Sequence, residues 1–268
     1  MGERDQVLRL LGDAGVLEGI RWAQGSAYRQ VQQDFNPAGG HDQGWIGYNA
    51  YKYLLNRLDR VFQCEQYMAP DGEESVGRDV LADGMIGRDY QTMRLLPPDA
   101  VNRRDLNNSP GWMAEGWRWL LSSYKFGQVD KIRWSEKSET KATVARQPHG
   151  CDDGGLFPMT AIPALALPEN PTDREREMRQ TLVLAHAMDP DTLEFELFLG
   201  RSRWNADGGS AWVWKQNMLD LPPELGNRGS RLQPLDPTTP RGDVVADVEL
   251  RVRRSARDGG TPRAIGEA

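Results

Sequence analysis

The first third of the chain spaces its apolar residues as amphipathic helices do. The clearest stripe runs from Ile46 to Val61, where apolar side chains recur mostly three and four residues apart and polar ones fall between them. This stripe predicts a helix over residues 46–63, and the same spacing predicts a short helix around residues 7–14 and a longer one over residues 16–35. The side chains expected in the core from the main stripe are Ala50, Tyr53, Leu54 and Leu58.

Residues 69–126 combine polar turns with one further helical stripe. A short helix is expected within residues 76–86. Another is predicted to begin at Ser109, a residue type favoured at the N-cap, with Pro110 in the first helical position. Its apolar face would hold Met113, Trp117, Leu120, Leu121 and Tyr124.

After Gly127 the pattern changes to the period of two that is typical of strands. The clearest alternation follows Asp189-Pro-Asp191, and it predicts a hairpin across that turn, with one face of the second strand buried and the other mostly exposed. The predicted strands are 129–134, 142–146, 181–188, 192–200 and 244–252.

This order of elements, helices first and strands later, predicts an α+β fold in which an N-terminal helical layer packs on a C-terminal antiparallel β-sheet. We expect one domain over residues 1–253, with a helical part at 1–126 and a strand-rich part at 127–253. Two proline-rich loops and a disordered tail complete the expected organisation: 147–171, 222–242 and 254–268.

Composition narrows the class of protein. The net charge of −6 argues against a protein wholly dedicated to coating DNA or an anionic membrane, although residues 101–150 carry 9 basic against 5 acidic residues. Six lysines against 27 arginines favour a GC-rich, bacterial genome. Cys64 and Cys151 form no disulfide framework, the N-terminus has no signal-peptide pattern and no apolar run is long enough to span a bilayer, so we expect a cytoplasmic protein without a membrane segment.

The leading hypothesis for function concerns a basic, aromatic-rich band between Arg103 and Arg146. Cations that neutralise phosphates, next to rings on which unpaired bases stack, are what binding of single-stranded nucleic acid requires. The band therefore predicts a binding or accessory subunit of a bacterial cytosolic assembly, with no cofactor, provided that its members share one accessible face. The contact residues expected are Arg104, Arg118, Trp119, Lys125, Lys131 and Arg133.

A catalytic alternative uses the same stretch. Some metal-dependent phosphodiesterases hold Mg²⁺ with an aspartate on one strand and a Glu-x-Lys sequence on the next. Asp130, Glu139 and Lys141 match this order, although a solvated hairpin tip would contain the same residue types.

The remaining candidates are weaker. Trp204, Trp212 and Trp214 are compatible with a surface for a protein partner, or with packing of the hairpin on the helices. The glycine-rich loop over residues 39–47 is compatible with an anion site or with an ordinary loop in which Asp42 caps the next helix. The histidines have no assigned role: His41, His149 beside Cys151, Asp152 and Asp153, and His186 within an apolar strand, where a structural role is favoured.

Overall fold

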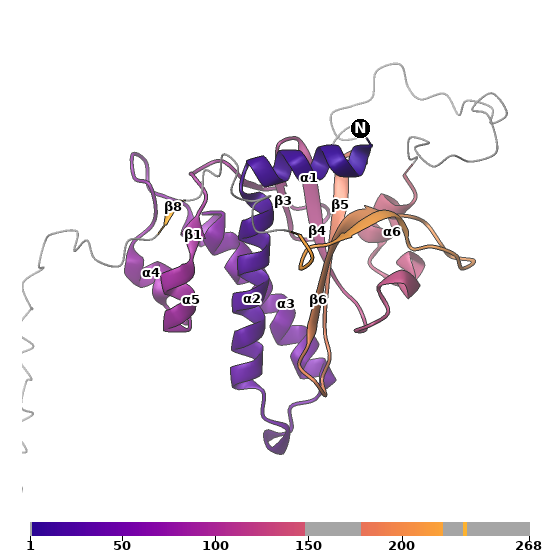
Figure 1. Ribbon diagram of the computed structural model, residues 1–268, viewed down its shortest axis with the longest axis horizontal. Helices are drawn as coiled ribbons and strands as arrows, with labels where there is room; N and C mark the ends of the chain where they lie inside the picture. The colour runs from indigo at the N-terminus through magenta and orange to yellow at the C-terminus, as the bar shows by residue number, and fades with distance from the viewer. Residues whose placement is uncertain (1, 148–177, 222–232, 235–268) are drawn as a thin grey trace, which may run out of the picture. The chain divides into compact units, whose positions relative to one another are not determined.

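The computed structural model describes residues 2–147, 178–221 and 233–234, and it confirms an α+β fold (Figure 1). Helices occupy the N-terminal part, and a six-stranded sheet follows. The predicted end of the domain at 253 and the strand at 244–252 lie outside the described residues, so they stay predictions. The part predicted to be helical, 1–126, also contains strands, which begin at Arg94.

Three helices form the N-terminal layer: α1 (Glu3–Asp13), α2 (Val16–Asp34) and α3 (Gln43–Val61). Their limits agree closely with the stripes in the sequence. Ala50, Leu54 and Leu58 of α3 are buried, whereas Tyr53 is only half-buried because its hydroxyl donates to Asp34 at the end of α2, at 2.8 Å. The apolar stripe therefore determined the position of α3 and most of its buried face.

Short elements connect this layer to the sheet. They are the 3-10 turns η1 (Pro37–Gly39) and η2 (Glu65–Tyr67), the helices α4 (Arg78–Ala82) and α5 (Gly87–Thr92), and strand β1 (Arg94–Leu95), which pairs with β8 (Gln233–Pro234). The short helix expected within residues 76–86 is therefore present as α4. None of the helices in the described ranges is both long enough and apolar enough to cross a membrane.

The main sheet has the strand order β2-β3-β4-β5-β6-β7. Its strands are β2 (Asn102–Arg103), β3 (Gly111–Ala114), β4 (Trp117–Ser123), β5 (Thr181–Met188), β6 (Phe195–Ser202) and β7 (Trp212–Asn217). The predicted hairpin is confirmed as the antiparallel pair β5 and β6. The sheet is mixed rather than purely antiparallel, because β4 and β5 run parallel.

Three local predictions were wrong. The helix expected from Ser109 is the β3–β4 hairpin, whose two-residue turn places Glu115 and Gly116 at φ values of 49° and 79°. Positive φ at both turn residues matches the twist of a tight hairpin, and it ends any helix. The strand expected at 129–134 consists of the 3-10 turns η3 (Val129–Lys131) and η4 (Trp134–Glu136), and the strand expected at 142–146 belongs to helix α6 (Glu139–Ala145).

Both faces of the sheet are covered. Alternate residues of β4 and β5, among them Trp119, Leu121, Leu182 and Leu184, pack against α1, α2 and α3. Val183 and Ala185 point the other way and pack against Val129, Ile132 and Trp134. Figure 1 shows α6 on the side of the sheet away from α2 and α3. Strand β5 is buried along its whole length, as a strand covered on both faces must be.

Candidate functional site

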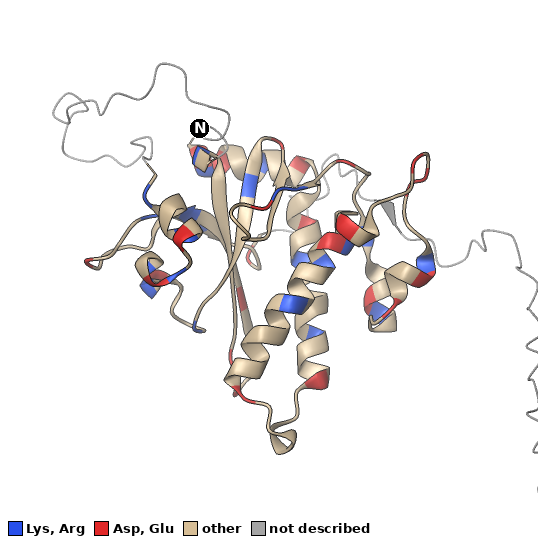
Figure 2. Ribbon diagram, turned by 180° about the vertical axis from the view of Figure 1, so that it is seen from behind, with Lys and Arg blue, Asp and Glu red and all other residues tan. Residues whose placement is uncertain are grey.

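The structure separates the six residues of the predicted nucleic-acid band. Arg104, Lys125, Lys131 and Arg133 are exposed. Arg118 and Trp119 have exposed fractions of only 3% and 0%, so neither is available at the surface. Both lie on β4, whose two faces are covered by other elements. The prediction that all six share one accessible face is therefore wrong for these two. Figure 2 shows basic and acidic residues interspersed over the described chain rather than gathered on separate faces.

The arrangement required for the phosphodiesterase is absent. Asp130 lies in η3 and forms an ion pair with Lys215, and Glu139 and Lys141 lie in the first turn of α6. None of the three is on a strand, so the paired strands that would bring the carboxylates together do not form. Within the described ranges, no three His, Cys, Asp or Glu side chains are grouped so that they could hold a metal ion.

The tryptophans considered for a protein partner face different parts of the fold. Trp212 is buried against Trp134 and donates to the carbonyl of Val129 at 2.9 Å. Trp214 is half-buried on the helical side, and its indole donates to Glu3 at 2.7 Å. Trp204 is half-buried, with the guanidinium of Arg146 3.8 Å from its ring centroid. These contacts hold the fold together and leave no single exposed aromatic patch among the three.

The glycine-rich loop over residues 39–47 leads into α3, and Asp42 caps that helix as the second interpretation of the loop expected. The side chain of Asp42 accepts the Trp45 amide at 2.8 Å, which makes it the N-cap of α3. His41 stacks on Trp45 at 4.1 Å between ring centroids, and its Nδ1 accepts the Asn36 amide. His149, Cys151, Asp152 and Asp153 lie outside the described residues.

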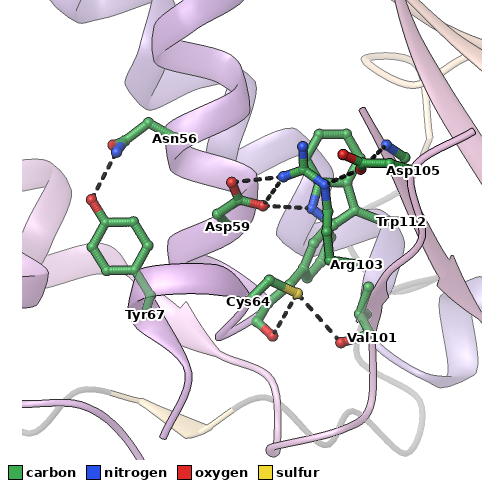
Figure 3. Close-up of polar contacts among 10 residues, drawn as sticks. Asn56, Asp59, Cys64, Tyr67, Val101, Arg103, Asp105 and Trp112 are labelled. Carbon is green, nitrogen blue, oxygen red and sulfur yellow. Dashed lines mark hydrogen bonds and ion pairs between the residues drawn. The ribbon is translucent and has the colours of Figure 1, made fainter. Parts of the chain in front are cut away.

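A buried polar cluster between the end of α3 and the strands β2 and β3 is also structural (Figure 3). Asp59 accepts two hydrogen bonds from Arg103, at 2.6 and 2.8 Å, and a third from the indole of Trp112 at 2.9 Å. Arg103 also pairs with Asp105 at 2.5 Å. Burial raises the pKa of the neighbouring Cys64 thiol to about 12, so the thiol stays protonated and is not a nucleophile at neutral pH. Arg103, one end of the predicted band, is therefore fully occupied.

The lysines between β4 and the first turn of α6 differ from Arg103, because they have few contacts within the fold. Four of the six lysines in the chain fall within residues 125–141, here called the lysine segment: Lys125, Lys131, Lys137 and Lys141. Lys137 donates to the carbonyl of Ser123 at 2.7 Å, and none of the four forms an ion pair with a carboxylate in the described part of the chain. Burial lowers the pKa of Lys137, and burial together with the charge of Lys137 lowers that of Lys141. The segment holds five basic residues, these four lysines and Arg133, against three acidic ones, so it carries a net positive charge.

A cavity of about 330 Å³ opens beside this segment, where the parallel strands β4 and β5 end. His186 on β5 lines it and has an exposed fraction of 1%. Its Nδ1 lies 2.7 Å from the hydroxyl of Tyr28 on α2, whereas its Nε2 has no hydrogen-bond partner among the described residues. Burial, with the charges of Lys141 and Lys137, lowers the pKa of His186 to about 3, so the imidazole is neutral. The structural role favoured for His186 describes only one of its two nitrogens.

Most predicted site residues are thus accounted for by contacts within the fold. The lysine segment and the cavity are not explained by such contacts. The sequence predicted the lysine segment only as part of a longer band, and it did not predict the cavity. Comparison of the chain with protein-family models, curated proteins and solved structures gives no match.

Proposed function

We propose that this protein binds single-stranded nucleic acid through the lysine segment, as a binding subunit rather than a catalytic one. The observation that carries the proposal is the set of four lysines without carboxylate partners in the described structure. Elsewhere in the same ranges, Arg29, Arg94, Arg103 and Arg201 each pair with a carboxylate. Unpaired cations on a chain of net charge −6 are the groups that an anionic partner would neutralise.

Two of the three acidic residues within the segment are paired with cations other than the four lysines, and the third is Glu139 in the first turn of α6. Asp130 is paired with Lys215, and Glu136 is paired with Arg133 at 3.1 Å. Lys125 and Lys131 are exposed and have no such partner, so phosphates can approach them from solvent. Arg104 and Arg133 are exposed but are not among the contact residues proposed here. Arg104 lies after β2, outside the lysine segment, and Arg133 is paired with Glu136.

Aromatic rings next to these lysines favour a single strand over a duplex. Tyr124 and Phe126 flank Lys125 and are half-buried, so part of each ring faces solvent. They take the place that Trp119 had in the sequence-based hypothesis. Unpaired bases stack on partly exposed rings, whereas bases within a duplex are already stacked on each other.

The cellular setting belongs to the same proposal. Cys64 is a free, buried thiol, and arginine greatly outnumbers lysine, which together favour the cytoplasm of a bacterium with a GC-rich genome. A binding subunit of this kind would serve a larger assembly that supplies any catalytic step.

The test is binding of a fluorescent single strand of roughly 16 nucleotides, measured by anisotropy at low salt. We expect the double reversal of Lys125 and Lys131 to Glu to weaken binding by at least about tenfold, because each lysine neutralises a phosphate. Lys52→Glu is the matched control, since Lys52 is exposed on α3 outside the segment, and it should keep affinity within about twofold. Absence of binding by the wild-type protein, or equal losses in both variants, would contradict the proposal.

A further inference from the structure

The cavity beside the lysine segment is bounded by elements that are far apart in the sequence. Strands β4 and β5 contribute their carboxyl ends, the place where open α/β sheets commonly bind ligands. Helices α2 and α3 close the opposite side. Its volume of about 330 Å³ lies at the lower end of the range for small-molecule sites. Its lining includes Tyr28, Gly47, Ala50, Lys125, Lys137 and His186.

The contact between Tyr28 and His186 favours one tautomer of the imidazole. Burial raises the pKa of Tyr28, so its hydroxyl keeps its proton and is a donor. The only acceptor recorded for that hydroxyl in the described structure is Nδ1 of His186, at 2.7 Å. A neutral imidazole that accepts at Nδ1 holds its proton at Nε2. Nε2–H is therefore a buried donor without an acceptor.

A buried donor without a partner costs about 1–3 kcal/mol, so native proteins seldom leave one without a reason. Here the donor belongs to a residue that lines a cavity, and Lys125 and Lys137 line the same cavity. Two carboxylates near this end of the sheet are already engaged. Glu196 accepts from the Tyr124 hydroxyl and the Gly127 amide, both at 2.9 Å, and Asp189, directly after β5, accepts from the Asp191 amide at 2.8 Å. The side chains of His186, Lys125 and Lys137 thus offer only donors.

The wall formed by α3 leaves room for a ligand. Gly47 and Ala50 line the cavity, and a Cβ added at Gly47 would meet no atom within 4 Å. Gly47 is exposed as well as part of the cavity lining, so a larger side chain at position 47 would stand at the rim of the cavity. Position 47 is helical, so such a side chain introduces no backbone strain.

We propose that this cavity binds a small anion through its carboxylate or phosphate group, with Nε2–H of His186 and the ammonium of Lys137 as donors. The proposal does not depend on binding of nucleic acid along the lysine segment, because it stands on the Tyr28–His186 pair and the cavity. Two sources share this chemistry: a free small molecule, and the terminal phosphate of a nucleic-acid strand.

The first measurement uses free anions alone. Inorganic phosphate and acetate are titrated into protein labelled with ¹⁵N at histidine, and the Nε2 resonance of His186 is followed. We expect a saturable shift for at least one of the two anions. Gly47→Met should weaken that binding by at least about tenfold by obstructing the cavity at its rim. Gly87→Met is the matched control, because position 87 also starts from a helical glycine with open space around it and lies in α5, outside the cavity.

A second variant tests the tautomer. Tyr28→Phe keeps the ring but removes the donor to Nδ1, so the proton of His186 is free to move between its nitrogens. We expect weaker anion binding, and we expect the Nε2 signal to change towards that of an unprotonated nitrogen. A calorimetric unfolding scan shows whether the variant is folded, and Gly47→Met carries the test if Tyr28→Phe is not.

The last measurement separates the two sources. Single strands with and without a 5′-phosphate are compared on wild-type protein and on Gly47→Met. Tighter binding of the phosphorylated strand that Gly47→Met abolishes assigns the cavity to a strand end, and a response to free anions alone assigns it to a small molecule. The proposal is overturned if no anion or strand end shifts the Nε2 resonance, or if Gly47→Met and Gly87→Met bind equally well. Failure of the lysine reversals alone leaves the free-anion result standing, so the two proposals fail separately.

Discussion

Arginines at the end of α3 and lysines in the lysine segment use positive charge in opposite ways. Arg57 and Arg60 are buried, and their guanidinium groups are surrounded by acceptors from the fold. Arg60 donates to the carbonyls of Val80, Leu81 and Asp83, and Arg57 donates to Ser26, Asn56 and the carbonyl of Gly84. Lys125, Lys131 and Lys141 have no recorded hydrogen bond or ion pair among the described residues.

The difference follows from the chemistry of the two side chains. A guanidinium presents five donors in a planar fork and is weakly hydrated, so it can satisfy several carbonyls in a buried site. The carbonyls held by Arg60 lie at the end of α4, where a helix has no intrahelical partners for them. An ammonium is compact and strongly hydrated, and in the lysine segment it keeps much of its capacity to bind. Cations of the first region stabilise the fold, and those of the second are available to a ligand.

The largest expected effect tests the first region. Replacing Arg60 with Met should lower the free energy of unfolding by about 2–4 kcal/mol, because it leaves several carbonyls of the α4 segment without their donor. The matched change Lys131→Met should alter it by less than about 0.5 kcal/mol, since Lys131 is exposed and has no recorded partner in the described structure. Urea unfolding of both variants measures the contrast, and equal losses would mean that the two cations do not differ in role.

The spacing of apolar residues predicted those helices and strands whose position depends mainly on residues close together in the sequence. The stripe in α3 and the alternation in β6 are read within a single element, and both elements were found where they were predicted. The exposed face predicted for the second strand was wrong, because no residue of β6 is exposed in a sheet that is covered on both faces. The β3–β4 hairpin was missed because Trp117, Leu120, Leu121 and Tyr124 also fit a helix. The turn at Glu115 and Gly116 decided between the two, and glycine at its second position was the available signal.

The site could be predicted much less well, because contacts that are distant in the sequence assemble it. Tyr28 and His186 are 158 residues apart, and the parallel pairing of β4 with β5 has no local signature. The burial of individual side chains was also difficult to predict from the sequence. Arg118 and Trp119 are of the residue types that bind nucleic acid, but strand pairing and the layers on both sides of β4 enclose them. The lysine segment lies within the predicted band between Arg103 and Arg146, but the concentration of lysines in it was not used in the prediction.

A second prediction concerns His186, which lines the cavity beside the lysine segment and is affected by the charges of Lys137 and Lys141. Its pKa falls from an ordinary value of about 6.5 to about 3 in the folded state because of burial and these two charges. Below about pH 6.5 the unfolded chain therefore binds a proton that the folded protein refuses, and stability falls as the pH falls towards 3. Between pH 7 and pH 5 the wild-type protein should lose about 2 kcal/mol more of its free energy of unfolding than His186→Gln.

Thermal or urea unfolding at the two pH values measures this difference. Glutamine keeps an acceptor for the Tyr28 hydroxyl, and His41→Gln controls for loss of a histidine as such. Identical pH dependence of the wild-type protein and His186→Gln would show that the imidazole is not held neutral by the fold.

The smallest effect in free energy tests the lysines most directly. Lys131→Met should leave stability nearly unchanged while it reduces the salt dependence of single-strand binding. One lysine that neutralises one phosphate contributes about 0.7 to the slope of log affinity against log salt on a single strand, because one counterion site is released. The slope, measured by anisotropy from about 50 to 200 mM salt, should fall by that amount in Lys131→Met and stay at the wild-type value in Lys52→Met. A slope unchanged in Lys131→Met would place the phosphates elsewhere, and the contrast between occupied arginines and available lysines would then describe the fold without explaining a function.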